Sequence, residues 1–300
     1  MANARALDKR RKSIKNIRKI TRTMELIATA RFKQAMDRAS AATAYTDRIT
    51  GLVSNLSNTG MELSHPLLDS HDEQQAATQL VLTSNRGLCG GYNGNVLRMA
   101  GENRQLLSEQ FSELQFEVSG KRGATYFENR KIPVAETFLQ FEDKPKYEDI
   151  ERIADRYLES YATGKIDRLD VCYTKFLSIA RQQATVETLL PLGGLTEEES
   201  GSGAKDKSAT SGSSSGIEFL PSAETILEEI VPMSFKVKLF KCFLDAAVSE
   251  QVARMVAMKS ATENADELIR ELSMTYNRAR QGQITGELLE VMGGVEALKN

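Results

Sequence analysis

The chain has 300 residues, of which 41% are hydrophobic and 27% are charged, and its formal net charge is -2. No stretch approaches the roughly 20 apolar residues that a membrane-spanning helix needs, and the N-terminus lacks the apolar core of a secretory signal. Cys89, Cys172 and Cys242 are odd in number and widely spaced, which argues against a disulfide framework and a C-x-x-C metal motif. We therefore expect a soluble intracellular protein with reduced thiols.

Residues 1–50 contain no glycine and no proline, which predicts one uninterrupted helix of roughly 75 Å at 1.5 Å per residue. This segment holds thirteen Lys and Arg against four Asp and Glu, so it carries +9 and the remainder of the chain carries -11. A heptad-like stripe predicts a coiled-coil seam. It runs through Ile14, Ile17, Thr21, Met24, Ala28, Arg31, Ala35, Arg38, Ala42, Tyr45, Ile49 and Leu52.

The middle of the chain alternates short apolar runs with amphipathic segments, which is typical of an α/β domain with a largely parallel sheet. The predicted strands are Gln79–Ser84, Leu114–Val118, Val134–Phe141, Arg168–Phe176 and Thr185–Leu190, and the predicted helices are Asn95–Phe111, Ala124–Asn129 and Tyr147–Tyr161. The Ser- and Gly-rich tract at residues 196–216 is expected to be a flexible surface loop.

The glycine-rich segment TSNRGLCGGYNGN, residues 83–95, follows a predicted strand but fits neither a P-loop nor the G-x-G-x-x-G dinucleotide pattern. A tight turn is the better interpretation. His65 and His71 have no zinc ligand set around them, and no nucleophile motif is present. We therefore expect no catalytic site, cofactor or metal, although an enzyme whose site forms only in space stays an alternative.

Residues 233–281 form a second run without glycine or proline. A comparable seam is predicted there and past Gly282, through Ala261, Ala265, Leu268, Leu272, Tyr276, Ala279, Ile284, Leu288, Val291 and Val295. Because a compact domain returns the chain between them, the two terminal helices should be antiparallel. The predicted organisation is a helix at 1–60, an α/β domain at 61–232 and a helix at 233–300.

The basic residues of the first helix suggest an anionic partner. Nucleic acid is one alternative, but the cations are spread around the helix and no nucleic-acid-binding motif is present. A protein with an acidic surface fits better, and a merely solvated charged face also stays open at this point.

Segments in four regions together resemble the gamma subunit of the rotary proton-translocating ATP synthase. They are IKNIRKITRTMELIATARF at 14–32, TSNRGLCGGYN at 83–93, TLLPL at 188–192, and, most strongly, SEQVARMVAMKSATENA at 249–265 with YNRARQGQITGELLEVMGG at 276–294. Asn85 stands where that family usually has aspartate, and Val295 where it often has alanine.

The resemblance implies a noncatalytic rotor shaft, peripheral to the cytoplasmic face of a bacterial inner membrane. In that family the terminal helices turn inside a ring of alpha and beta subunits, while the α/β domain contacts the epsilon subunit and the proton-driven c ring. Residues 291–300 would reach an apolar bearing. Carried over by motif, the contacts to acidic beta-subunit loops are Met24, Arg254, Arg280, Gln281, Thr285 and Glu287. A nucleic-acid-binding coiled-coil protein remains the alternative.

Overall fold

Two long helices dominate the computed structural model, which describes residues 4–57, 66–68, 71, 74–141, 144–192 and 223–297. Helix α1 runs over Ala4–Ser57 and helix α5 over Ala223–Ala297, with 54 and 75 residues. Helix α5 therefore starts upstream of the predicted start at Met233 and continues through Pro232. Proline removes one backbone donor, and the buried side chains of Val231 and Phe235 hold this turn in place. The tract at 196–216 lies outside the described residues.

The chain divides into two compact units. The shaft unit comprises residues 1–30, 88–90 and 253–300, and the sheet unit comprises residues 31–87 and 91–252. Each long helix therefore contributes one portion to each unit.

The sheet unit is built on five strands in the order β3-β2-β1-β4-β5. The strands are β1 Ala76–Leu82, β2 Glu113–Ser119, β3 Glu136–Phe138, β4 Arg168–Phe176 and β5 Gln182–Leu190. Pairs β1–β2, β1–β4 and β2–β3 are parallel, which confirms the predicted α/β fold. Strand β5 runs antiparallel to β4, because residues 177–181 are too few for a crossover connection.

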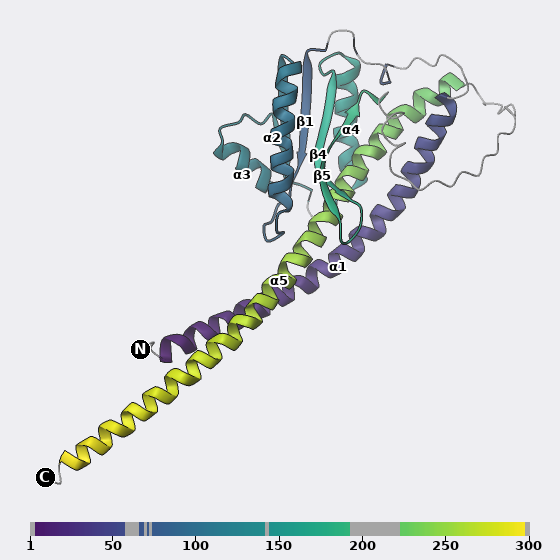
Figure 1. The fold of residues 1–300 in the computed structure, drawn as a ribbon. Helices are drawn as coiled ribbons and strands as arrows, with labels where there is room; N and C mark the ends of the chain where they lie inside the picture. The colour runs from purple at the N-terminus through teal and green to yellow at the C-terminus, as the bar shows by residue number, and fades with distance from the viewer. Residues whose placement is uncertain are drawn as a thin grey trace. The chain divides into compact units, whose positions relative to one another are not determined.

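Helices cover both faces of this sheet, as Figure 1 shows for α2 and α4. They are α2 Tyr92–Gln110, α3 Lys121–Asn129 and α4 Tyr147–Ala162. Side chains alternate along each strand, so Val81 of β1 packs with α2 and α3, whereas Leu80 and Leu82 pack with α4 and α5. Residues of α5 from Val231 to Ala246 thus belong to the core of the sheet unit.

The predicted turn after β1 is closely packed against the neighbouring strand ends. The Asn85 side-chain amide donates to the carbonyl of Phe141 at 2.9 Å, and its oxygen accepts from the Lys121 N–H at 2.9 Å. Gly120 has a φ of 100°, and a Cβ at this position would overlap the carbonyl of Thr83. An aspartate could not donate as Asn85 does, so this departure from the usual family residue has a structural use.

Candidate functional site: the two-helix shaft

In the shaft unit, α1 and α5 run antiparallel. The Arg11 guanidinium lies 4.7 Å from the centroid of the Tyr276 ring. Farther along, Arg18 Nε lies 2.6 Å from Asp266 Oδ1, and the hydroxyl oxygens of Thr21 and Thr262 are 2.8 Å apart. Residue numbers rise along α1 as they fall along α5, which confirms the predicted direction of the pair.

Small side chains form much of the buried seam. Ala28 is fully buried and Ala265 is nearly so, while Met258 is a larger side chain buried in the same seam. Because Ala buries little area, this part of the pair is slim and gains little apolar stabilisation per turn. The seam deviates from the strict heptad prediction, since Ile17 is about half exposed (48%).

The same deviation appears in the portion of α1 that belongs to the sheet unit. There Ala39 is buried with Leu244 of α5, while Arg38, which was predicted for the seam, is exposed. A straight helix with 3.6 residues per turn drifts away from a 3.5-residue repeat. This drift explains why the buried position is Ala39 and not the predicted Arg38.

The last turns of α5 carry an exposed apolar surface, here called the apolar tip. Its side chains are between 44% and 67% exposed: Ile284, Leu288, Leu289, Val291, Met292 and Val295. The predicted extension of the seam past Gly282 is therefore wrong within the shaft unit. The first turn of α1 lies beside Ile284 and Glu287 at one groove, and the described part of α1 starts there, at Ala4.

The six residues carried over by motif all lie in the shaft unit. Arg280, Gln281, Thr285 and Glu287 are exposed on α5, and Met24 is half-buried on α1. Arg254 differs from them because it is only 7% exposed. The structure thus places four of these side chains together near the apolar tip, with Met24 and Arg254 farther along the shaft.

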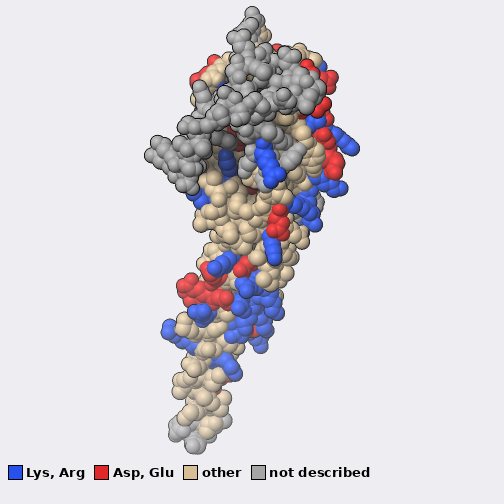
Figure 2. Space-filling model, turned by 90° about the vertical axis from the view of Figure 1, so that its right-hand side faces the viewer, with Lys and Arg blue, Asp and Glu red and all other residues tan. Residues whose placement is uncertain are grey.

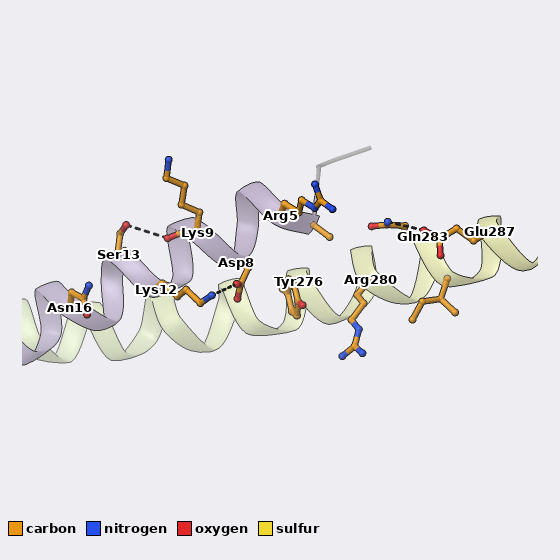
Figure 3. Close-up of a pocket in the computed structure, with 12 residues that line it drawn as sticks. Arg5, Asp8, Lys9, Lys12, Ser13, Asn16, Tyr276, Arg280, Gln283 and Glu287 are labelled. Carbon is orange, nitrogen blue, oxygen red and sulfur yellow. Dashed lines mark hydrogen bonds and ion pairs between the residues drawn. The ribbon is translucent and has the colours of Figure 1, made fainter.

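A groove of about 680 Å³ separates the start of α1 from α5. Its lining holds four basic residues, Arg5, Lys9, Lys12 and Arg280, and two acidic ones, Asp8 and Glu287. Figure 3 shows Lys9 and Arg280 projecting from opposite sides of the helix pair. Asp8 accepts from both Arg11 at 2.7 Å and Lys12 at 2.9 Å, and these cations hold the pKa of its carboxyl below the usual value.

Positive charge in the shaft unit belongs mainly to α1. From Ala4 to Ala30 this helix has nine Lys and Arg against Asp8 and Glu25. Figure 2 shows Lys and Arg side chains gathered across this part of the molecule. Such a surface attracts an acidic partner over roughly 10 Å at moderate ionic strength.

Sequence reasoning missed an ion pair between the two helices, Arg18 with Asp266. The sequence does show opposite charges on two predicted antiparallel helices. It does not show which residue of one helix lies opposite which residue of the other, so the pair could not be identified. Among the described residues, no group of three His, Cys, Asp or Glu side chains could hold a metal ion. Within the same ranges, no helix is long and apolar enough to cross a membrane.

Comparisons with known proteins agree with this architecture. The family described as ATP synthase matches residues 3–298. The ATP synthase gamma chain of Rhodopirellula baltica is 62% identical over 301 residues, covering all of both chains. That of Saccharopolyspora erythraea is 38% identical over 314 residues, covering 100% of this chain and 99% of the relative.

Solved structures share the fold at lower sequence identity. A chain of the Euglena gracilis mitochondrial ATP synthase, from a structure of its OSCP, F1 and c-ring, superposes with a TM-score of 0.63 at 20% identity, covering 98% of this chain and 94% of that one. A chain from the central stalk and c-ring of the Tetrahymena thermophila mitochondrial enzyme gives 0.56 at 18% identity, covering 81% and 99%.

The fold, a sheet unit combined with two paired long helices, is the one that these chains of solved ATP synthases share. The chain belongs to the ATP synthase gamma chain family. This assignment gives no support to the nucleic-acid-binding alternative.

Proposed function

We propose that this chain is the rotor shaft of a rotary ATP synthase and transmits torque between a proton-driven c ring and a hexamer of alpha and beta subunits. The observation that carries the proposal is the antiparallel helix pair of the shaft unit, which is continuous over its length and ends in the apolar tip. A rod that transmits torque needs such continuity, because a hinge would absorb the rotation.

The coupling is allostery by a rotating ligand. A shaft whose faces differ can bind one conformation of a catalytic subunit better than another, and only that difference in affinity shifts the conformation. The shaft unit has the required asymmetry. Its α1 portion is strongly basic, whereas α5 from Ala253 to Ala297 has five basic and seven acidic residues.

The contacts to acidic beta-subunit loops are proposed to involve Met24, Arg254, Arg280, Gln281, Thr285 and Glu287. Four of these side chains are exposed, and two of the four, Arg280 and Glu287, line the basic groove, which supports a role in contact. Arg254 is buried in the chain itself, so its contribution would come mainly from holding the surface in shape. The apolar tip would turn in an apolar bearing formed by the hexamer.

The remaining assignments are proposed by analogy with the family. The middle α/β domain, predicted at 61–232, would contact the epsilon subunit and the c ring, and helix α5 starts at Ala223, ten residues before the predicted boundary. The chain would have no catalytic site of its own and would lie at the cytoplasmic face of a bacterial inner membrane, attached through the complex.

Affinity purification tests this proposal. The full chain, tagged and isolated from its native cell under gentle conditions, should bring down alpha and beta subunits of an ATP synthase in stoichiometric amounts. Recovery of the intact chain without those subunits would contradict the proposal. Salt-sensitive binding of the isolated chain to DNA, with no ATPase subunits recovered, would favour the nucleic-acid alternative instead.

A further inference from the structure

The seam of the shaft unit leaves the axial register of the two helices weakly determined. Alanines such as Ala28 and Ala265 pack closely, but one alanine fits against a helix surface much like the next. In a coiled coil, a large side chain fits only one gap between the side chains of the facing helix and so fixes the axial position. A small side chain allows one helix to slide past the other with little loss of apolar contact. Met258 is a larger buried side chain of the same seam, and Ala39 packs with Leu244 in the sheet unit, so a polar contact would act together with this packing to select the register.

A buried polar contact interrupts this seam. Thr21 and Thr262 are 9% and 8% exposed, and their hydroxyl oxygens lie 2.8 Å apart. Each oxygen also lies near a carbonyl of its own helix, Thr262 at 2.8 Å from Met258 and Thr21 at 3.1 Å from Arg18. Each hydroxyl has one proton, so one threonine donates across the interface while the other donates to its own backbone.

An ion pair lies one turn away. Arg18 and Asp266 have side chains that are 51% and 36% exposed, and their 2.6 Å contact joins α1 to α5. Exposed pairs of this kind contribute little to stability because water and salt screen them. They still favour one alignment, because sliding in one direction brings Arg18 beside Lys259 and sliding in the other leaves Arg18 beside the uncharged Ser273.

Sliding by one heptad would break both contacts. In one direction Arg18 would face Lys259 and Thr21 would face Met255, and in the other direction they would face Ser273 and Ile269. The first shift places two cations side by side, and both shifts place a seam hydroxyl against an apolar side chain. Each hydroxyl could still donate to the carbonyl of its own helix after such a shift, but the contact between the two hydroxyls and the Arg18–Asp266 ion pair would be lost, so neither alternative register reproduces the observed contacts.

We propose that Arg18, Thr21, Thr262 and Asp266 form a register cluster that fixes the axial alignment of α1 against α5. These contacts support the alignment of the two helices, and the effect of that alignment on the coupling of proton transport to ATP turnover rests on the proposed function. A slip of one heptad moves one helix about 10 Å along the other. The contact residues on α1 and α5 would then no longer face the partner subunits as one surface, and torque would be lost.

The alignment can be measured in the full chain by the distance between two spin labels. Ala30→Cys and Asn277→Cys place labels at exposed positions of the shaft unit, and the three native cysteines are buried and therefore poorly reactive. The otherwise unchanged chain should give one distance. Asp266→Arg should add a second component displaced by roughly 10 Å, and Arg18→Asp combined with Asp266→Arg should remove it.

Matched variants separate alignment from general damage. Glu267→Arg makes the same charge change at the next, exposed position and should leave one distance. Thr21→Val should broaden the distribution, Thr21→Ser should restore it, and Thr29→Val, at an exposed threonine, should have no effect. A single unchanged distance in both Asp266→Arg and Thr21→Val would overturn the proposal.

The whole synthase in vesicles gives the functional readout. Asp266→Arg should lower the ratio of ATP-driven proton pumping to ATP hydrolysis severalfold, and the double charge reversal should recover it. A shifted distance with unchanged coupling would overturn the link between register and torque. Failure of the unmodified chain to assemble with alpha and beta subunits would contradict the proposed function instead, while the distances in the isolated chain would still decide the alignment.

Discussion

Replacement of Asp245 by asparagine is expected to stabilise the sheet unit at alkaline pH. Asp245 lies on α5 and is only 6% exposed. Burial raises the pKa of its carboxyl to about 6, from an ordinary value of 3.8, although the nearby Lys241 and Lys175 favour the charged form. The carboxylate of Glu187 on β5 adds to the increase.

The expected magnitude follows from that pKa. A difference of about 2 between the folded and unfolded pKa corresponds to about 3 kcal/mol of unfolding free energy. Because the folded pKa is the higher one, the favourable contribution of the protonated acid is complete below the unfolded pKa. It is lost as pH rises from about 4 to about 6, so at pH 8 the ionised carboxylate destabilises the fold by the full amount.

Thermal unfolding of the full chain measures this effect. Asp245→Asn removes the charge and nearly preserves the shape, so its midpoint should exceed that of the unmodified chain by roughly 5–10 °C at pH 8. Near pH 4 the difference should almost vanish. Asp37→Asn, at an exposed position of α1, is the matched control and should be neutral at both pH values. An equal midpoint at pH 8, or a gain that grows on acidification, would refute the reasoning.

Three further outcomes follow from the structure. Gly120→Ala should cost about 2–3 kcal/mol of unfolding free energy because of the positive φ of 100° and the close backbone, whereas Gly101→Ala, in open space on α2, should be neutral or stabilising in the same thermal melt. Met24→Lys should lower the ratio of proton pumping to ATP hydrolysis in vesicles severalfold, since it adds a charge on the half-buried shaft surface, and equal ratios for it and the exposed control Thr23→Lys would count against this contact. Leu288→Asp should weaken assembly with alpha and beta subunits in a pull-down by at least tenfold, because a carboxylate would enter an apolar bearing. Normal recovery of those subunits would show that the apolar tip is not part of the interface.

The secondary structure was largely predictable because its signals are local. The strand Arg168–Phe176 was predicted with the bounds that the structure shows, and the other four strands and helices α2, α3 and α4 were predicted within three residues at each end, whereas α5 starts ten residues upstream of its predicted start. Strand β3 is shorter than predicted because only Glu117 to Ser119 of β2 pair with it. The extent of a strand depends on its neighbour, which sequence periodicity does not contain.

Contacts between distant segments were harder to predict. Periodicity identified a seam, but the exposure of Ile17 reflects the drift of a 3.6-residue helix from the heptad repeat, and the exposure of the apolar tip depends on how far α1 extends along α5. The pairing of Arg18 with Asp266 needs the same alignment. Motifs carried over from the family identified contact candidates, yet they could not show that Arg254 is buried in the chain itself.

Rotation of the chain within its complex tests the central claim most directly. A bead can be attached through Glu109→Cys, an exposed position on α2, because the native cysteines are buried. With the alpha and beta subunits immobilised, addition of ATP should turn the bead continuously in one direction. A bead that stays still while the same assembled complexes continue to hydrolyse ATP would contradict the account of this chain as the rotor shaft.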